Sequence, residues 1–173
     1  MNDLLTLLQK TYKHGIYAAS EVPSLERAST GITTLDVALG GGLPVGRIIE
    51  LYGLESGGKS ATCLSIAETF VKAGKSVLYI DMERTVTQEA VENNNLNNAA
   101  DSGSFVVTWP TYGEMAIEQI IDGVNAGAKL VIVDTVAMLQ PKSTYDKLEK
   151  DTEGRDIGGT AGMLNRLKSR IID

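Results

Sequence analysis

The sequence predicts an α/β fold in which a mostly parallel sheet lies between two layers of helices. Short apolar runs alternate along the chain with segments of helical periodicity, as in repeated strand–helix units. Each apolar run is continuous instead of alternating with polar residues, which indicates strands buried on both faces. The chain has 173 residues, of which 43% are hydrophobic, and this is enough for one compact domain with its own core.

The expected strands are four apolar runs, and segments of helical periodicity separate them. The strands cover residues 47–53, 76–81, 104–109 and 129–135. The helices between them cover residues 59–73, 85–95 and 113–126. The first and last of these helices are each followed by a glycine, which readily adopts the left-handed backbone that closes a helix. A strand–helix–strand order favours parallel pairing.

Further helices are expected before and after this alternation. Residues 3–13 place several leucines on one broad apolar face, and residues 34–39 form a short helix stopped by three glycines. Residues 163–172 form the last helix. Its outward side chains make either a solvated face or a DNA contact, and they are Arg166, Lys168 and Arg170.

The composition narrows the function classes. A net charge of −6 argues against nucleic-acid binding over the whole surface, while a local basic patch stays open. The single cysteine, Cys63, excludes an internal disulfide, fits a reducing compartment and is expected to pack as a small apolar side chain. We expect a cytoplasmic protein with no membrane partner, because no basic signal-peptide region and no run of about 20 apolar residues is present.

Residues 53–60, GLESGGKS, form a glycine-rich loop between an expected strand and an expected helix. The spacing matches G-x-x-x-x-G-K-[ST], in which glycines let backbone N–H groups curl round phosphate oxygens. The start of the following helix adds its partial positive charge. The motif predicts a P-loop nucleotide site, and an ordinary glycine-rich turn is the alternative. The residues expected to bind nucleotide are Gly53, Leu54, Glu55, Ser56, Gly57, Gly58, Lys59, Ser60 and Ala61.

Three polar side chains have expected roles at this site. Lys59 reaches the β- and γ-phosphates and is a catalytic candidate, and the Ser60 hydroxyl ligates Mg²⁺. Asp134 ends the run KLVIVD, where a parallel strand meets the ligand crevice, and is expected to hold Mg²⁺ through a water molecule. The alternative role for Asp134 is that of a helix N-cap.

Two acids compete for the role of catalytic carboxylate. Glu83 lies just past the run SVLYID and is the expected residue to orient or deprotonate the water that attacks the γ-phosphate. Asp81 competes from the end of the same strand, and a solvated loop position is the plain alternative for Glu83. Trp109 ends the next strand, where a core or rim position is expected.

Several segments together resemble the core of the RecA family of bacterial and phage recombinases. They occur in the family's order and at similar spacing, and they are STGITTLDVALGGGLPVGRIIELYGLESGGKS, SVLYIDMER, TYGEMAIEQI and LVIVDTVAMLQPK. The similarity covers about residues 28–172. It implies a three-layer αβα P-loop NTPase with a RecA-type core.

The resemblance implies an ATP-dependent homologous recombination protein. Such proteins bind ATP and Mg²⁺ between neighbouring protomers, form a helical filament on single-stranded DNA and pair it with homologous duplex DNA. Glu83 matches the family's catalytic glutamate, and Asp134 matches its Walker B aspartate. Residues 149–162 occupy the place of the first DNA-binding loop. The candidate DNA contacts are Arg155, Gly158, Gly159 and Arg166.

The resemblance also divides the chain. Residues 1–27 correspond to an N-terminal helix and oligomerisation arm that docks on the adjacent subunit, and residues 28–173 correspond to the ATPase core. This sequence stops before the family's last core strands, which carry a glutamine that senses the γ-phosphate, and before its second DNA-binding loop. It has Ala61 where the family often has a second hydroxyl. Near Ala90 it lacks the aromatic residue that the family stacks on adenine.

Two other functions stay open on the sequence. A RecA-fold ATPase of another kind would share the glycine-rich loop but hydrolyse ATP independently of DNA. A nucleotide-binding paralogue or fragment would instead regulate a complete recombinase, without strand exchange of its own.

Overall fold

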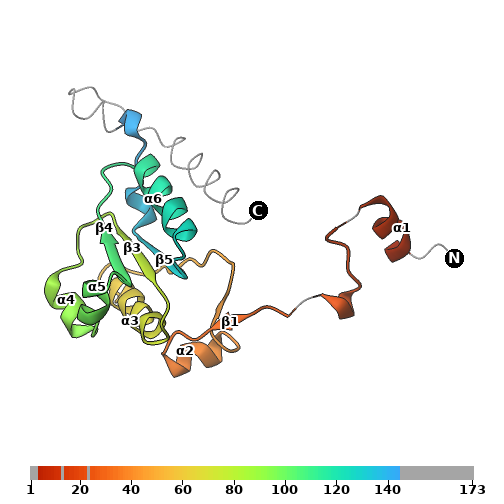
Figure 1. The fold of residues 1–173 in the computed structure, drawn as a ribbon, viewed down its shortest axis with the longest axis horizontal. Coiled ribbons are helices and arrows are strands. Elements are labelled where there is room, and N and C mark those ends of the chain that lie inside the picture. The colour runs from red at the N-terminus through yellow and green to blue at the C-terminus, as the bar shows by residue number, and fades with distance from the viewer. Residues whose placement is uncertain (1–3, 13, 23, 145–173) are drawn as a thin grey trace.

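The structure, a computed structural model, describes residues 4–12, 14–22 and 24–144. Its centre is a parallel sheet with the strand order β4-β3-β5 (Figure 1). The central strand is β3 (Val77–Asp81), which pairs with β4 (Phe105–Thr108) on one side and β5 (Leu130–Asp134) on the other. In this register Asp81 lies opposite Asp134, so two carboxylates end neighbouring strands at the same edge of the sheet.

Helices cover both faces of this sheet. Successive side chains of a strand point to opposite faces, and accordingly Tyr79 packs in one core cluster while Leu78 and Ile80 pack in another. The first cluster includes side chains from α3, α4 and α5, or next to them, and the second includes side chains from α6. The predicted three-layer αβα fold is therefore confirmed. The helices are α3 (Lys59–Lys72), α4 (Gln88–Asn93), α5 (Asn97–Asp101) and α6 (Gly113–Asn125).

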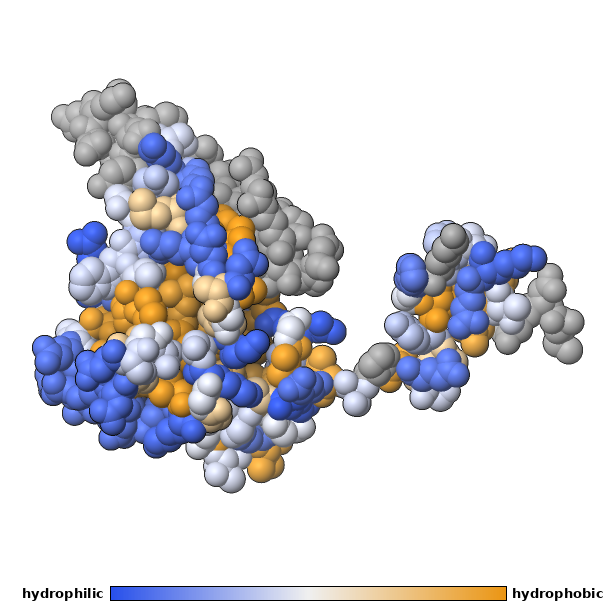
Figure 2. All heavy atoms as spheres, in the orientation of Figure 1, coloured by the Kyte–Doolittle hydropathy of each residue, from blue (hydrophilic) through white to orange (hydrophobic). Residues whose placement is uncertain are grey.

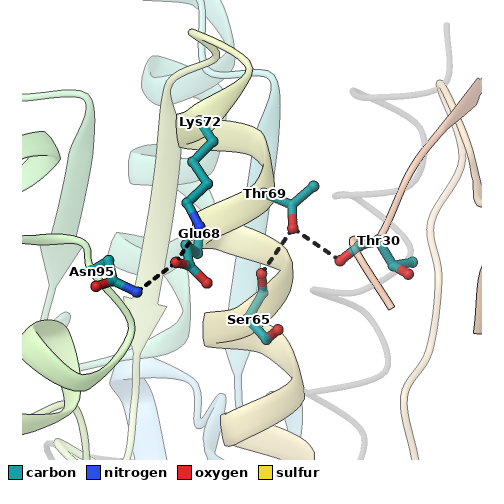
Figure 3. Close-up of polar contacts among 6 residues, drawn as sticks. All are labelled: Thr30, Ser65, Glu68, Thr69, Lys72 and Asn95. Carbon is teal, nitrogen blue, oxygen red and sulfur yellow. Dashed lines mark hydrogen bonds and ion pairs between the residues drawn. The ribbon is translucent and has the colours of Figure 1, made fainter. Parts of the chain in front are cut away.

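Polar contacts fasten α3 to its neighbours on two sides (Figure 3). On one side, Thr69 Oγ1 donates to the backbone oxygen of Thr30 at 3.2 Å. On the other, Asn95 Nδ2 donates to Glu68 Oε1 at 2.7 Å, and the Lys72 ammonium pairs with the same oxygen at 2.6 Å. These contacts fix the helix that begins at the glycine-rich loop.

Residues before the glycine-rich loop form small elements outside the parallel sheet. In Figure 1, α1 (Leu4–Thr11) lies apart from the sheet; it buries no residue, and Leu4 and Leu7 are 69% and 53% exposed. The helix expected at residues 3–13 is thus present as α1, and the helix expected at residues 34–39 is present as α2 (Thr33–Ala38). The remaining small elements are η1 (Ala19–Glu21), β1 (Arg27–Ala28) and β2 (Leu43–Pro44), with β1 and β2 paired antiparallel.

The strand predicted over residues 47–53 is wrong for the described structure. These residues form no strand, and Ile48, Ile49 and Leu51 are each about half exposed. A β-strand needs a neighbouring strand to satisfy its backbone N–H and C=O groups. No described segment supplies one here, because the outer edge of β5 pairs with no strand within residues 24–144. Apolar character alone was therefore an insufficient signal.

The surface of the core is mixed in polarity. Figure 2 shows a hydrophobic band over β4, where Val106 is 42% exposed, bordered by hydrophilic surface on the helices.

Within the described residues, no helix combines the length and the apolar character needed to cross a membrane. The last predicted helix and the four candidate DNA contacts (Arg155, Gly158, Gly159 and Arg166) lie outside the described residues.

Asp36 joins α2 to the segment that precedes it. This contact makes the stability of the folded state depend on pH in a testable way. Its carboxylate accepts hydrogen bonds from Ser29 Oγ at 2.6 Å, Thr30 Oγ1 at 2.6 Å and Thr30 N at 2.8 Å. The bonds from the side chains of Ser29 and Thr30 hold the pKa of Asp36 below its usual value. The folded state therefore favours the ionised form, and this stabilisation is present above the ordinary pKa and lost as the pH falls.

We predict that Asp36→Asn lowers the melting temperature at pH 7. The difference from wild type should shrink as the pH falls below about 4, because wild-type Asp36 is then protonated as well. Thermal melts of both proteins across this range, followed by circular dichroism, provide the measurement. A difference that stays constant with pH would contradict the role given to the carboxylate charge.

Candidate active site

The glycine-rich loop, residues 53–60, is a mostly exposed and tightly curled segment of backbone. Gly58 is the N-cap of α3 and has φ of +82°, in the left-handed region that glycine adopts without strain. Ser56 has φ of +57°. A Cβ on Gly57 would lie 2.9 Å from the Leu54 oxygen, so a side chain there would crowd the loop. The loop curls tightly and its residues from Gly53 to Gly58 are exposed.

Backbone donors gather at the start of α3. Within the described part of the chain, the N–H groups of Lys59, Ser60 and Ala61 donate to no protein acceptor, as expected for the first turn of a helix. Nearby, Lys59 Nζ donates to the backbone oxygens of Leu54 at 2.9 Å and Gly53 at 3.3 Å. An ammonium and a row of N–H groups therefore lie together, a set of donors suited to phosphate oxygens.

The end of β5 lies beside this first turn. Ser60 Oγ donates to Asp134 Oδ2 at 2.6 Å, although 74 residues separate the two along the chain. The same oxygen accepts a hydrogen bond from Tyr79 OH on β3 at 2.7 Å. Asp134 does not cap the short helix η2 (Val136–Met138), whose N-cap is Thr135 without a side-chain bond. The carboxylate therefore faces the loop, and the N-cap alternative is wrong.

Burial raises the pKa of two protonated groups that lie near Asp134. Burial, followed by the hydrogen bond to Asp134, raises the pKa of Tyr79 far above its ordinary value. Burial also raises the pKa of the Cys63 thiol to about 11, with a smaller contribution from the negative charge of Asp134. Cys63 packs at the margin of the core cluster under α3, as expected. Both groups therefore stay protonated and uncharged beside the carboxylate at neutral pH.

Asp81 and Glu83, the two competing acids, have different surroundings. Asp81 is fully buried, and its carboxylate accepts hydrogen bonds from Thr85 N at 3.1 Å, Val86 N at 3.0 Å and Trp109 Nε1 at 3.1 Å. Glu83 is exposed on the turn that these bonds hold in place. Asp81 thus anchors the backbone of this turn, and Glu83 is the exposed carboxylate of the pair.

The residues present at this edge of the sheet fit Mg²⁺ together with a nucleotide. Within the described residues, no group of three or more histidines, cysteines or acids gathers into a cation site of its own. Mg²⁺ usually binds through one or two protein oxygens and otherwise through phosphates and water. The Ser60 hydroxyl and the Asp134 carboxylate supply two such oxygens next to the backbone N–H groups that begin α3.

The family model described as the RecA N-terminal domain matches residues 2–172. The chain belongs to the RecA family. Its curated relatives include Protein RecA of Mycoplasma genitalium, which is 36% identical over 157 residues, covering 90% of this chain and 44% of the relative. Protein RecA of Campylobacter jejuni subsp. jejuni strain 81-176 is 35% identical over 172 residues, covering 96% of this chain and 48% of the relative. The chain thus spans about half the length of the curated relatives it matches.

Within this RecA family chain, the structure brings some predicted site residues together and adds others. The glycine-rich loop, Ser60 and Asp134 meet at one edge of the sheet, and Glu83 follows the adjacent strand. Sequence reasoning missed the hydroxyl of Tyr79 as a partner of Asp134. The available signal was a tyrosine inside an otherwise apolar strand, because a buried phenol needs a hydrogen-bond acceptor.

We predict that Asp81→Ala loosens the turn that carries Glu83. Hydrogen bonds to charged groups contribute about 1.5–3 kcal/mol each, so amide exchange at Thr85 and Val86 should accelerate at least about 10-fold. Hydrogen exchange measured by NMR provides the test, with amides of α6 as an internal reference. Unchanged protection at Thr85 and Val86 would contradict the anchoring role of Asp81.

Proposed function

We propose that this chain is the ATP-binding and ATP-hydrolysing core of an ATP-dependent homologous recombination protein. The observation that supports this best is the 2.6 Å contact between Ser60 Oγ and Asp134 Oδ2, which joins the first turn after the glycine-rich loop to the sheet edge. Donors suited to phosphate oxygens and oxygens suited to Mg²⁺ are adjacent there, which would meet what phosphoryl transfer requires. Membership of the RecA family supports the recombination role.

In this proposal, the loop and its lysine bind the triphosphate of ATP. The backbone N–H groups at the start of α3 donate to the β- and γ-phosphates, and Lys59 Nζ turns from the loop carbonyls to the same oxygens. Ser60 would hold Mg²⁺ directly and Asp134 would hold it through water. When bound, Mg²⁺ neutralises charge that develops on the phosphate oxygens.

Glu83 is the proposed catalytic carboxylate. Glu83 is exposed on a turn whose backbone N–H groups donate to the Asp81 carboxylate. Its side chain would therefore be free to contact a water molecule at the γ-phosphate. A carboxylate in that place accepts a proton from the attacking water or orients it. The buried Asp81 is left as the residue that positions this turn.

DNA binding and assembly complete the proposal. We place single-stranded DNA along the segment of residues 149–162, with contacts at Arg155, Gly158, Gly159 and Arg166, and homologous duplex DNA as the second substrate. Glycines suit a loop that orders on a polyanion, and arginine pairs with phosphate. The subunits would assemble as a helical filament in the cytoplasm.

The first test separates binding from hydrolysis. We predict that Lys59→Ala weakens ATP binding at least about 10-fold, because a charge-assisted phosphate contact is lost. Glu83→Gln should keep ATP binding and lower the hydrolysis rate by about 10²–10⁴-fold, since it removes the proton acceptor. Isothermal titration and a phosphate-release assay measure the two quantities, with Glu89→Gln on α4 as a matched exposed-acid control.

The same assays distinguish the proposed function from its alternatives. Single-stranded DNA should stimulate hydrolysis, and its binding should weaken steeply with salt, as contacts to phosphates do. Hydrolysis that ignores DNA would favour a RecA-fold ATPase of another kind. ATP binding without hydrolysis, with or without DNA, would favour a nucleotide-binding regulator of a complete recombinase.

The N-terminal residues 1–27 are the proposed oligomerisation arm, and residues 28–173 are the proposed core. α1 exposes Leu4 and Leu7, so one face of this helix is available to bury against a neighbouring subunit. We predict that deleting residues 1–20 prevents assembly on single-stranded DNA while the remaining chain still binds ATP. Sedimentation velocity with and without DNA provides the measurement, and assembly of the truncated protein would contradict the arm assignment.

A further inference from the structure

The carboxylate of Asp134 is held by hydroxyls from two different elements. Ser60 Oγ on α3 donates to Oδ2 at 2.6 Å, and Tyr79 OH on β3 donates to the same oxygen at 2.7 Å. Within the described part of the chain, Oδ1 accepts no hydrogen bond. One oxygen is therefore fixed by two donors, and the other is left for a further ligand.

The phenol of Tyr79 has little freedom to choose another partner. Its residue is 0% exposed, and its ring packs edge-on against Phe105 with a centroid separation of 6.4 Å and an interplanar angle of 72°. The ring belongs to the core cluster under α3. Because packing fixes the ring, the position from which the hydroxyl can donate its hydrogen bond is fixed as well.

Packing alone does not account for this hydroxyl. A phenylalanine would fill the same space, and burying a hydroxyl in an apolar core is costly unless it makes a hydrogen bond. The hydroxyl makes its bond to Asp134, the residue that would hold Mg²⁺ in the proposed function. Groups that hydrogen-bond to a metal-binding carboxylate orient it, and their loss typically weakens metal binding 10- to 100-fold.

We propose that Tyr79 is a positioning residue for the magnesium site, an inference that rests on the proposed function. By holding Oδ2, it turns Oδ1 of Asp134 toward the cation's water shell. It also shares the acceptor with Ser60. The Ser60 hydroxyl has one proton and two lone pairs, so its bond to Asp134 directs the proton away and leaves the lone pairs for the cation.

The experiment compares metal-dependent and metal-independent nucleotide binding in the full chain. Mn²⁺ is the probe, because the electron paramagnetic resonance signal of free Mn²⁺ reports binding in the presence of ADP. We expect Tyr79→Phe to weaken Mn²⁺ binding to the ADP complex about 10-fold or more. ADP binding measured with a chelator and no metal should stay as in wild type, since the glycine-rich loop is untouched.

A matched variant and a double-mutant comparison make the test specific. Tyr112→Phe removes a hydroxyl that makes no hydrogen bond within the described residues, and it should leave Mn²⁺ binding unchanged. In an Asp134→Ala background, Tyr79→Phe should have no further effect on Mn²⁺ binding, because the carboxylate through which it acts is gone. Circular dichroism melts confirm that each variant is folded at the assay temperature.

The outcomes separate this inference from the proposed function. Wild-type protein that binds neither ADP nor Mn²⁺–ADP would overturn both. Normal Mn²⁺ binding by Tyr79→Phe, with wild type also binding, would overturn the positioning role and leave the proposed function intact. Equal losses of metal-free and metal-dependent binding, or a variant too unstable to assay, would make Tyr79 a packing residue and overturn the inference as well.

Discussion

The carboxylate of Asp134 is the point at which the glycine-rich loop is joined to the sheet. The hydrogen bond from Ser60 spans 74 residues of sequence, and within residues 24–144 the loop and the end of β5 are otherwise connected by apolar packing through α3. Charge-assisted hydrogen bonds are about twice as strong as neutral ones, so this short contact fixes the distance between the first turn of α3 and the carboxylate. The geometry of the candidate active site depends on that one acceptor.

Along the central strand β3, the side chains on one face are apolar, and two side chains on the other face, Tyr79 and Asp81, make hydrogen bonds. Leu78 and Ile80 point to the face of α6 and contribute apolar area. Tyr79 points to the other face and reaches Asp134, while Asp81 ends the strand and anchors the turn that carries Glu83. A strand with neighbours on both sides is held at fixed register, so these residues keep their positions relative to β5.

The sequence predicted the core elements well because their signals are local. Continuous apolar runs identified β3, β4 and β5, and the spacing of glycines, lysine and serine identified the start of α3. The signals failed where structure depends on a partner far along the chain. Residues 47–53 are apolar but have no described strand beside them, and the bond from Tyr79 to Asp134 joins side chains whose strands must first be paired in register. Short α5 carried no periodic signal at all.

Residues 47–53 pair with no described strand, so α3 is the element that holds the glycine-rich loop in position. Among described residues, the chain enters the loop without ladder hydrogen bonds and leaves it through a helix with buried Leu64, Ala67 and Phe70. Thr69 adds a hydrogen bond to Thr30, and Gly31 allows that approach, since a Cβ there would lie 2.0 Å from Thr69 Oγ1. A change in this packing, far from the N–H groups at the start of α3, would therefore move Ser60 relative to Asp134. The position of the loop is therefore set by the helix that follows it in the chain.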